Sequence, residues 1–438
     1  MKTASSGISN VTPPRKSYLA KLLLVGASLL VTFVFLEVGL RAAGIVYGGS
    51  FYQGDLVRGW SFRPGAHAWA VAEGKEYVRI NSDGFRDREH AIQKPPDTVR
   101  IGVLGDSYVE AMNVPSENAF PSVIERELSH CAAIGNRKVD VFNFGVSGYG
   151  TAHELLTLRE RVWKYNPDII LLAFYTGNDF FNNYRPLNIF DTDQGPYFVY
   201  RGDELVVDNS FRNSWKFSKP YLWFFNFRGD LRNHSRVLQL LAKTVDDLRI
   251  KGAKATAGKA AAGLGVSDLE DMIYSPPADA GMKEAWHVTE GLLLIMRDEV
   301  RSHGAELWLT TLANRPQLNP DTSQRQAFMN RLHIDTPFYP DLRLRAFAQQ
   351  AGIPAITLAP IMSEHAETHH VFLNGGRVVP LGVGHWNEKG HELAGGLIAS
   401  ELCSHSEKIS VSAGSHAFAG KIAHLTIANS AAQNGSGR

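Results

Sequence analysis

A serine that directly follows a short apolar strand is the first residue of this chain that could do chemistry. Residues 101–104 form the apolar run, and Gly105, Asp106 and Ser107 come straight after it. In open α/β sheets, ligands bind at the carboxyl ends of the strands. A serine hydroxyl there can act as a nucleophile if a base takes its proton and hydrogen-bond donors stabilise the resulting oxyanion.

Three later segments carry residues that could supply these groups. Gly148 lies in the glycine-rich stretch 143–150, Asn178 follows an apolar strand pattern, and His385 opens the last predicted helix. Each segment alone is typical of an ordinary turn or helix start. The four segments occur in this order and at the ends of predicted elements. Together they predict a site for nucleophilic catalysis with Ser107 as the candidate nucleophile.

Alternating strand and helix patterns predict the sheet that positions these residues. The predicted strands are 99–104, 139–142, 169–175, 306–311 and 355–358. The predicted helices are 119–130, 152–165, 285–303, 341–351 and 387–403. Such alternation favours an α/β fold with a parallel sheet. We expect a flavodoxin-like, three-layer α/β/α arrangement with strand order 2-1-3-4-5, in which the first and third strands are neighbours at the ligand-binding edge.

The four segments resemble the SGNH, or GDSL-type, hydrolases, which are serine esterases and lipase-like enzymes. The resemblance extends over residues 99–400 and is specific at the four short motifs. It implies that Ser107 is the nucleophile and His385 its general base. It also implies an oxyanion hole made by the backbone N–H groups of Ser107 and Gly148 and the side-chain amide of Asn178. We expect no cofactor and no metal, since the sequence has no HExxH motif and no credible metal cluster.

One residue of the family pattern is missing. Family members usually carry an aspartate two or three residues before the histidine, where this chain has Gly382 and Val383. Three interpretations follow: a backbone carbonyl orients His385, an acid from elsewhere such as Glu364 or Glu367 replaces the aspartate, or the site is impaired. The other intact motifs favour the first two.

The N-terminal region predicts a membrane segment. It contains no acid before residue 37, residues 22–36 are uncharged, and its basic residues precede them: Lys2, Arg15, Lys16 and Lys21. Snorkelling of Lys21 extends the apolar run toward the length of a spanning helix. Basic residues before the span predict a cytoplasmic segment 1–17, a signal-anchor 18–44 in a bacterial inner membrane, and an extracytoplasmic remainder.

The alternative is a cleaved signal peptide. Cleavage after Ala43 would place Arg41 where a small residue belongs, so we favour the uncleaved anchor.

Bulk composition restricts the partners and the redox chemistry. The net charge of +1 over 438 residues argues against nucleic acid as a partner. The two cysteines, Cys131 and Cys403, each end a predicted helix on the same side of the sheet. One disulfide or two free thiols are both compatible with this placement.

The remaining organisation is predicted from composition. Residues 45–98 form a connector docked on a hydrolase domain 99–405, and this domain contains an insertion, 180–284. Within the insertion, 252–265 has the composition of a mobile loop. The tail 406–438 has the composition of a disordered segment.

These observations predict an extracytoplasmic serine esterase that hydrolyses carboxylic esters through an acyl-serine. Its expected substrates are O-acyl groups on envelope glycans or lipid-like esters. Two alternatives remain: an acyltransferase that passes the acyl group to a polysaccharide hydroxyl, and a non-catalytic relative that binds a glycan or a protein.

Overall fold

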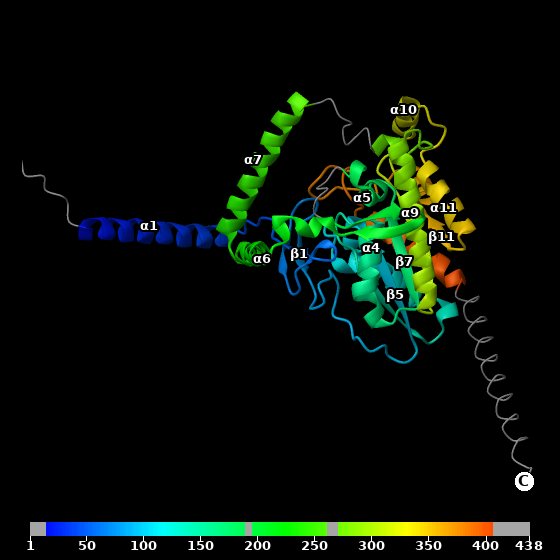
Figure 1. Cartoon of the computed structure of the whole chain (residues 1–438), viewed down its shortest axis with the longest axis horizontal. Coiled ribbons are helices and arrows are strands. Elements are labelled where there is room, and N and C mark those ends of the chain that lie inside the picture. Colours follow the sequence, from blue (N-terminus) through cyan, green and yellow to red (C-terminus); the bar gives the residue numbers. More distant parts are fainter. Residues whose placement is uncertain (1–14, 189–194, 261–269, 406–438) are drawn as a thin grey trace, which may run out of the picture.

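The computed structural model describes residues 15–188, 195–260 and 270–405 (Figure 1). The predicted disordered tail and most of the predicted cytoplasmic segment lie outside the described residues. A central sheet with helices on both faces forms the body of the molecule, and helices α1 and α7 project from it.

The central sheet has five parallel strands. They are β5 (Thr98–Gly105), β6 (Lys138–Asn143), β7 (Ile169–Tyr175), β10 (Glu306–Leu312) and β11 (Ala355–Thr357). Their spatial order is β6-β5-β7-β10-β11. This order confirms the predicted 2-1-3-4-5 arrangement. Every residue of β5 is buried, because layers of helices cover both faces of the sheet.

Two apolar cores, one on each face, hold the helices to the sheet. Leu104 of β5 faces the first core, and its neighbour Val103 faces the second. The first core packs α4 (Thr151–Thr157), α9 (Ala280–Ser302) and α11 (Tyr339–Gln350) against the sheet. The second packs α3 (Phe120–Leu128), α12 (Leu358–Thr368) and the last helix, 388–405. The fold is therefore the predicted three-layer α/β/α arrangement.

Other short elements complete the body. The helix predicted over 152–165 is α4 followed by a π-helical turn, Leu158–Val162, and a 3₁₀ turn, Trp163–Tyr165. Helix α10 (Thr322–Leu332) follows β10. The loops at the carboxyl edge of the sheet contain α2 (Ser107–Glu110) and α5 (Asp179–Asn183).

The connector forms two antiparallel hairpins. These are β1 (Tyr52–Asp55) with β2 (Gly59–Phe62), and β3 (His67–Ala70) with β4 (Glu76–Arg79). They share a small apolar core with Val146 and Tyr149 of the glycine-rich loop. Trp60 Nε1 donates to the Ser147 carbonyl at 3.0 Å, and Tyr149 Oη donates to the Trp60 carbonyl at 2.5 Å. The connector is thus packed against the glycine-rich loop.

The described part of the insertion contains a hairpin and two long helices, besides short helical turns. The hairpin is β8 (Tyr197–Arg201) with β9 (Glu204–Asp208), and the helices are α6 (Lys219–His234) and α7 (Arg236–Ala260). The predicted mobile loop 252–265 is wrong in its first part, because 252–260 continue α7; the rest lies outside the described residues.

Helix α1 (Arg15–Ala42) contains the predicted apolar span. Its part Tyr18–Ala42 is long and apolar enough to cross a membrane, and none of its most apolar window is buried.

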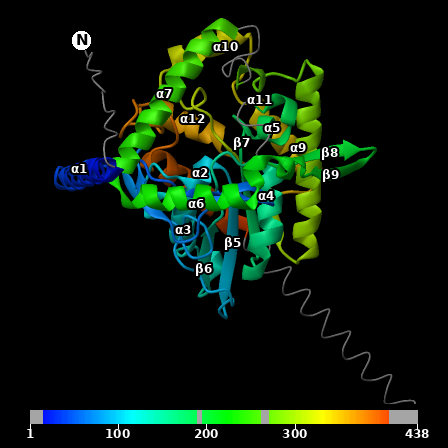
Figure 2. The ribbon, with the colours of Figure 1, turned by 60° about the vertical axis from the view of Figure 1, so that its left-hand side comes forward.

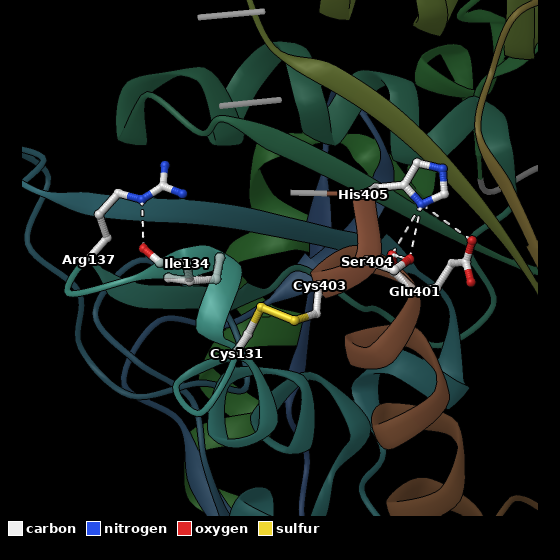
Figure 3. Close-up of a disulfide and its surroundings, with 7 residues drawn as sticks. All are labelled: Cys131, Ile134, Arg137, Glu401, Cys403, Ser404 and His405. Atoms are coloured by element: carbon white, nitrogen blue, oxygen red, sulfur yellow. Dashed lines mark hydrogen bonds and ion pairs between the residues drawn. A yellow bond between two sulfur atoms is a disulfide. The ribbon is translucent and has the colours of Figure 1, made fainter. Parts of the chain in front are cut away.

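A disulfide joins Cys131 and Cys403 (Figure 3). Cys131 lies just after α3 and Cys403 lies in the last helix, and the two Cα atoms are 5.8 Å apart. Both residues adjoin the second core. The bond therefore joins the segment after α3 to the last helix, across 272 residues of chain.

Removing this disulfide should destabilise the protein. The double variant Cys131→Ala/Cys403→Ala should lower the free energy of unfolding by about 2–5 kcal/mol, because the unfolded chain regains the freedom of a long closed loop. Denaturant titration of the full chain in detergent measures this. A reductant should lower the stability of the wild type but not of the double variant. Equal stability of the two oxidised proteins would contradict the prediction.

Candidate active site

A tight turn at the end of β5 brings Ser107 to the carboxyl edge of the sheet. The side chain of Asp106 caps α2, since its Oδ1 accepts the Tyr108 N–H at 2.9 Å. A Cβ on Gly105 would lie 2.3 Å from Cγ2 of Val109, so only glycine fits at this position beside α2. The buried strand therefore ends in a turn that leaves Ser107 partly exposed.

Three side chains form a hydrogen-bonded relay at this edge. Ser107 Oγ and His385 Nε2 are 2.7 Å apart, and His385 Nδ1 is 2.9 Å from Glu73 Oε2. The same carboxylate oxygen accepts the His385 backbone N–H at 2.6 Å. A carboxylate only accepts hydrogen bonds, so the imidazole carries its proton on Nδ1 and leaves Nε2 free to take the serine proton.

Glu73 is the acid that the sequence pattern lacked. It lies in the turn between β3 and β4, within the connector. Neither proposed substitute takes this position: Glu367 pairs with Arg325, and His385 Nδ1 bonds to Glu73. The interpretation of a dyad oriented by a backbone carbonyl is wrong for the same reason.

A glycine beside His385 makes room for this carboxylate. Gly384 has φ +79°, and a Cβ there would lie 2.4 Å from Glu73 Oε2. On the other side, a Cβ on Gly74 would lie 2.3 Å from the Asn113 carbonyl oxygen. The two glycines let the hairpin turn and the histidine loop approach closely enough for Glu73 to reach His385.

The charges of His385 and Glu73 stabilise each other. Burial lowers the pKa of His385, but the hydrogen bond and charge of Glu73 outweigh it, and the pKa lies above its usual value. Burial raises the pKa of Glu73, but its hydrogen bonds and the charge of His385 outweigh this effect and lower the pKa. The relay therefore favours the imidazolium that forms when the serine loses its proton.

The glycine-rich loop is fixed beside the serine turn. The Val146 N–H donates to the Gly105 carbonyl at 3.1 Å, and Asn182 Nδ2 donates to the Gly148 carbonyl at 3.4 Å. Gly148 has φ +79°, a conformation that favours glycine. The loop thus leaves β6 and crosses toward the end of β5.

Asn178 lies at the end of the neighbouring strand. It directly precedes α5 and follows β7, which pairs with β5 up to Gly105 and Ala173. Its Oδ1 is buried and has no hydrogen-bond partner among the described residues. The segments that carry Ser107, Gly148 and Asn178 therefore leave the sheet at the same edge, from three adjacent strands.

Residues 101–207 match the GDSL-like lipase/acylhydrolase family. The match spans the segments of Ser107, Gly148 and Asn178, whereas His385 and Glu73 lie outside it. This segment of the chain is therefore similar to GDSL-type ester hydrolases. No curated protein sequence matches the chain significantly.

Solved structures of esterases show low overall similarity. The acetyl xylan esterase AlAXEase is 12% identical with a TM-score of 0.35, covering 69% of this chain and 100% of its own. The lipase/acylhydrolase from Enterococcus faecalis is 14% identical with a TM-score of 0.32, covering 70% and 96%. A lipolytic protein of the G-D-S-L family from Desulfitobacterium hafniense is 11% identical with a TM-score of 0.31, covering 69% and 98%. At these values the neighbours say nothing about the substrate of this hydrolase domain.

The carboxyl group of Glu110 is buried beside the candidate site and bonds to two of the segments that form it. Tyr52 Oη donates to its Oε1 at 2.7 Å, and the Ser147 N–H donates to its Oε2. The Arg86 guanidinium binds the Glu110 carbonyl at 2.8 Å. Burial raises the pKa of Glu110 to about 7, although these hydrogen bonds oppose the rise. Glu110 thereby links the connector to the glycine-rich loop.

Three more carboxyl groups are fully buried near the serine turn. Burial raises the pKa of Asp106 to about 6 and those of Glu154 and Asp179 well above the usual value. Asp179 accepts the Tyr175 N–H at 2.8 Å, which joins the start of α5 to the end of β7. Both carboxyl oxygens of Glu154 lack a partner among the described residues. Mutual repulsion of these groups favours protonation of some of them at neutral pH.

An open cavity of about 560 Å³ leads to the relay. Ser107, His385 and Glu110 lie in its wall, and its apolar part is formed by Phe51, Tyr52, Trp69 and Met112. Within the described ranges, no group of three His, Cys, Asp or Glu residues could hold a metal ion.

Replacing Glu73 should damage both the rate and its pH dependence. Glu73→Gln should lower kcat by about 10²–10⁴-fold, since the amide cannot hold the imidazole in the same tautomer and charge state. The carboxylate raises the pKa of His385, so its loss should move the acidic limb of the kcat/KM profile to lower pH. Hydrolysis of p-nitrophenyl acetate measures both effects.

The matched control is Glu76→Gln, which removes the same charge from the same hairpin, where Glu76 pairs with Arg377. This variant should keep the wild-type profile. Identical rates and profiles for Glu73→Gln and Glu76→Gln would exclude Glu73 from the relay.

The space at Gly384 should be essential to the relay. Gly384→Ala places a Cβ against the Glu73 carboxylate and strains a positive φ, so we expect a lower kcat and a loss of about 1–3 kcal/mol in unfolding free energy. Gly396→Ala, in the last helix with open space around it, should keep full activity. Comparable kcat values for the two variants would contradict this account.

Proposed function

We propose that this chain is a membrane-anchored serine carboxylesterase that works through an acyl-serine intermediate. The observation that carries the proposal is the continuous relay from Ser107 Oγ through the His385 ring to the Glu73 carboxylate. An alcohol nucleophile, a base within hydrogen-bond distance and an acid that orients the base are the parts that acyl transfer to serine requires.

The geometry gives each residue a step in ester hydrolysis. Ser107 Oγ attacks the ester carbonyl carbon while its proton moves to His385 Nε2, and Glu73 stabilises the imidazolium. The tetrahedral intermediate collapses, and the alcohol leaves with the proton from His385. Water then attacks the acyl-serine with His385 again as base, releasing the carboxylic acid and the free serine.

Preorganised donors would stabilise the oxyanion of the tetrahedral intermediate. We assign this role to the Ser107 and Gly148 backbone N–H groups and the Asn178 side-chain amide. The placement of their segments at one edge of the sheet, and the positive φ of Gly148, support the assignment. One such donor is worth about 3–4 kcal/mol in known enzymes.

We assign α1 as an uncleaved anchor, with the hydrolase domain outside the cytoplasm of a bacterial cell. Glu37 of α1 accepts the Arg236 and Val237 N–H groups, each at 3.0 Å, and Arg41 Nη2 donates to the His234 carbonyl at 2.7 Å. A helix whose end caps α7 in this way is integrated into the folded domain, unlike a removable signal peptide. The Cys131–Cys403 disulfide supports the location outside the cytoplasm.

The envelope location favours O-acylated glycans or lipid-like esters as substrates. The complete relay supports an active enzyme over a relative that only binds glycan or protein. Hydrolysis and transfer use the same acyl-serine, and they differ in whether water or a glycan hydroxyl accepts the acyl group.

The nucleophile can be tested directly. Ser107→Ala should lower kcat/KM for p-nitrophenyl acetate by about 10⁴-fold or more, because no other group can form the acyl-enzyme. It should leave the thermal stability nearly unchanged. Ser129→Ala, an exposed serine at the C-terminal end of α3, is the matched control and should stay fully active.

Rapid acid quenching followed by peptide mass spectrometry should find the acyl group on the peptide that contains Ser107. Wild-type activity in Ser107→Ala would overturn the proposal. Release of the acyl group to an added glycan rather than to water would assign the enzyme to acyl transfer.

A further inference from the structure

Helix α6 presents a stripe of large apolar side chains to solvent. Trp223, Phe224, Phe227 and Leu231 recur on one side of the helix and are between 44% and 68% exposed. The Trp223 and Phe227 rings stack with their centroids 5.4 Å apart. Contiguous exposed apolar residues of this size mark an interaction surface.

The opposite face of α6 already has its partners. Leu222 contacts Gly54 of β1, and the Asn226 carbonyl accepts a hydrogen bond from Arg63 Nη1 at 3.2 Å. The buried Gly229 also packs against Arg63. These contacts fix the orientation of the helix, so the apolar stripe points away from the domain.

The end of α6 is bonded to the end of α1. Arg41 of α1 binds the carbonyl of His234, the last residue of α6, and Glu37 binds Ser235 Oγ at 2.9 Å. The uncharged run 22–36 ends just before Glu37, so Glu37 and Arg41 lie where a helix of this length leaves the hydrocarbon of a bilayer. With α1 as the proposed anchor, these contacts hold the junction of α6 and α7 at the membrane surface.

The figures show how these helices lie relative to α1. In Figure 1, α6 lies between the end of α1 and strand β1, and α7 runs away from α1 rather than alongside it. In Figure 2, where α1 is foreshortened, α6 and α7 extend across the front of the domain. Both helices thus lie on the face from which α1 projects, across its axis.

The charge of this region suits an anionic surface. Between residues 209 and 250 the sequence has eight Lys or Arg and three Asp. Arg228 is exposed beside the apolar stripe, and Lys243 is exposed on α7. Aromatic residues with flanking basic residues are typical of helices that lie in the headgroup region of anionic bilayers.

We propose that α6 and the first half of α7 lie in the headgroup region of an anionic bilayer and open the catalytic cavity to esters of amphiphiles held in that bilayer. The membrane placement rests on the proposed anchoring by α1, and the substrate part rests on the proposed esterase function. The cavity that contains Ser107 and His385 also has Gly48, just after α1, Arg232 of α6 and Lys243 of α7 in its wall. The cavity therefore extends from the relay to helices α6 and α7.

Tryptophan quenching tests the position of α6. The full chain is reconstituted into vesicles of phosphatidylglycerol and phosphatidylcholine with brominated acyl chains. Helix α1 contains no tryptophan, so quenching reports on the domain. We expect quenching in the wild type, and Trp223→Phe should lose about half of it or more. Trp163→Phe, which removes a tryptophan stacked on His303, should lose none.

Two results would overturn the membrane placement. One is no quenching in the wild type, or quenching that is unchanged in Trp223→Phe. The other is a dimer in the bilayer that the double variant Trp223→Ser/Phe227→Ser dissociates, which would assign the stripe to a second copy of the chain.

Activity tests the substrate class separately. Trp223→Ser/Phe227→Ser should lower kcat/KM for a short-chain ester of a bilayer phospholipid analogue by about tenfold, while soluble p-nitrophenyl acetate is hydrolysed as by the wild type. An equal rate on the bilayer ester would overturn the substrate class. No hydrolysis of either ester by the wild type, with quenching intact, would overturn the esterase function and leave the membrane placement standing.

Discussion

The hydrogen bond between Glu73 and His385 is the interaction on which the site depends. It spans 312 residues of sequence and joins the connector to the loop before the last helix. A neutral imidazole is a usable base only if one tautomer faces the serine, and a charged imidazole is stable here only if a carboxylate faces it. The connector thus contributes Glu73 to the candidate site.

Close backbone approaches make this arrangement possible. Gly384 leaves room for the Glu73 carboxylate, Gly74 for the Asn113 carbonyl, and Gly105 for Val109 behind the serine. A side chain at any of these positions would move one partner of the relay by a large fraction of an ångström or more. The relay tolerates little such movement, because hydrogen bonds weaken steeply outside their normal range of distance and angle.

The same connector relates the candidate site to the apolar helix α1. Residues just after α1 line the catalytic cavity, and Glu37 of α1 caps α7. Buried Glu110 then joins Tyr52 of the first connector hairpin to the glycine-rich loop. These contacts join the end of α1 to the insertion and the connector to the glycine-rich loop, and they hold the candidate site near the end of an apolar helix.

The sequence by itself determined the fold class, the strand order and the apolar helix, because these follow from local hydrophobic periodicity and from the rules of parallel α/β sheets. Short motifs at the ends of elements also led to Ser107, Gly148, Asn178 and His385 as candidate site residues, whose roles stay predictions. Only the tertiary structure decided that Glu73 bonds to His385, that 252–260 are helical, and that Cys131 meets Cys403. The acid of a relay is defined by where its carboxylate lies in space, and a glutamate in a hairpin turn has no local pattern that reveals a contact with a distant histidine.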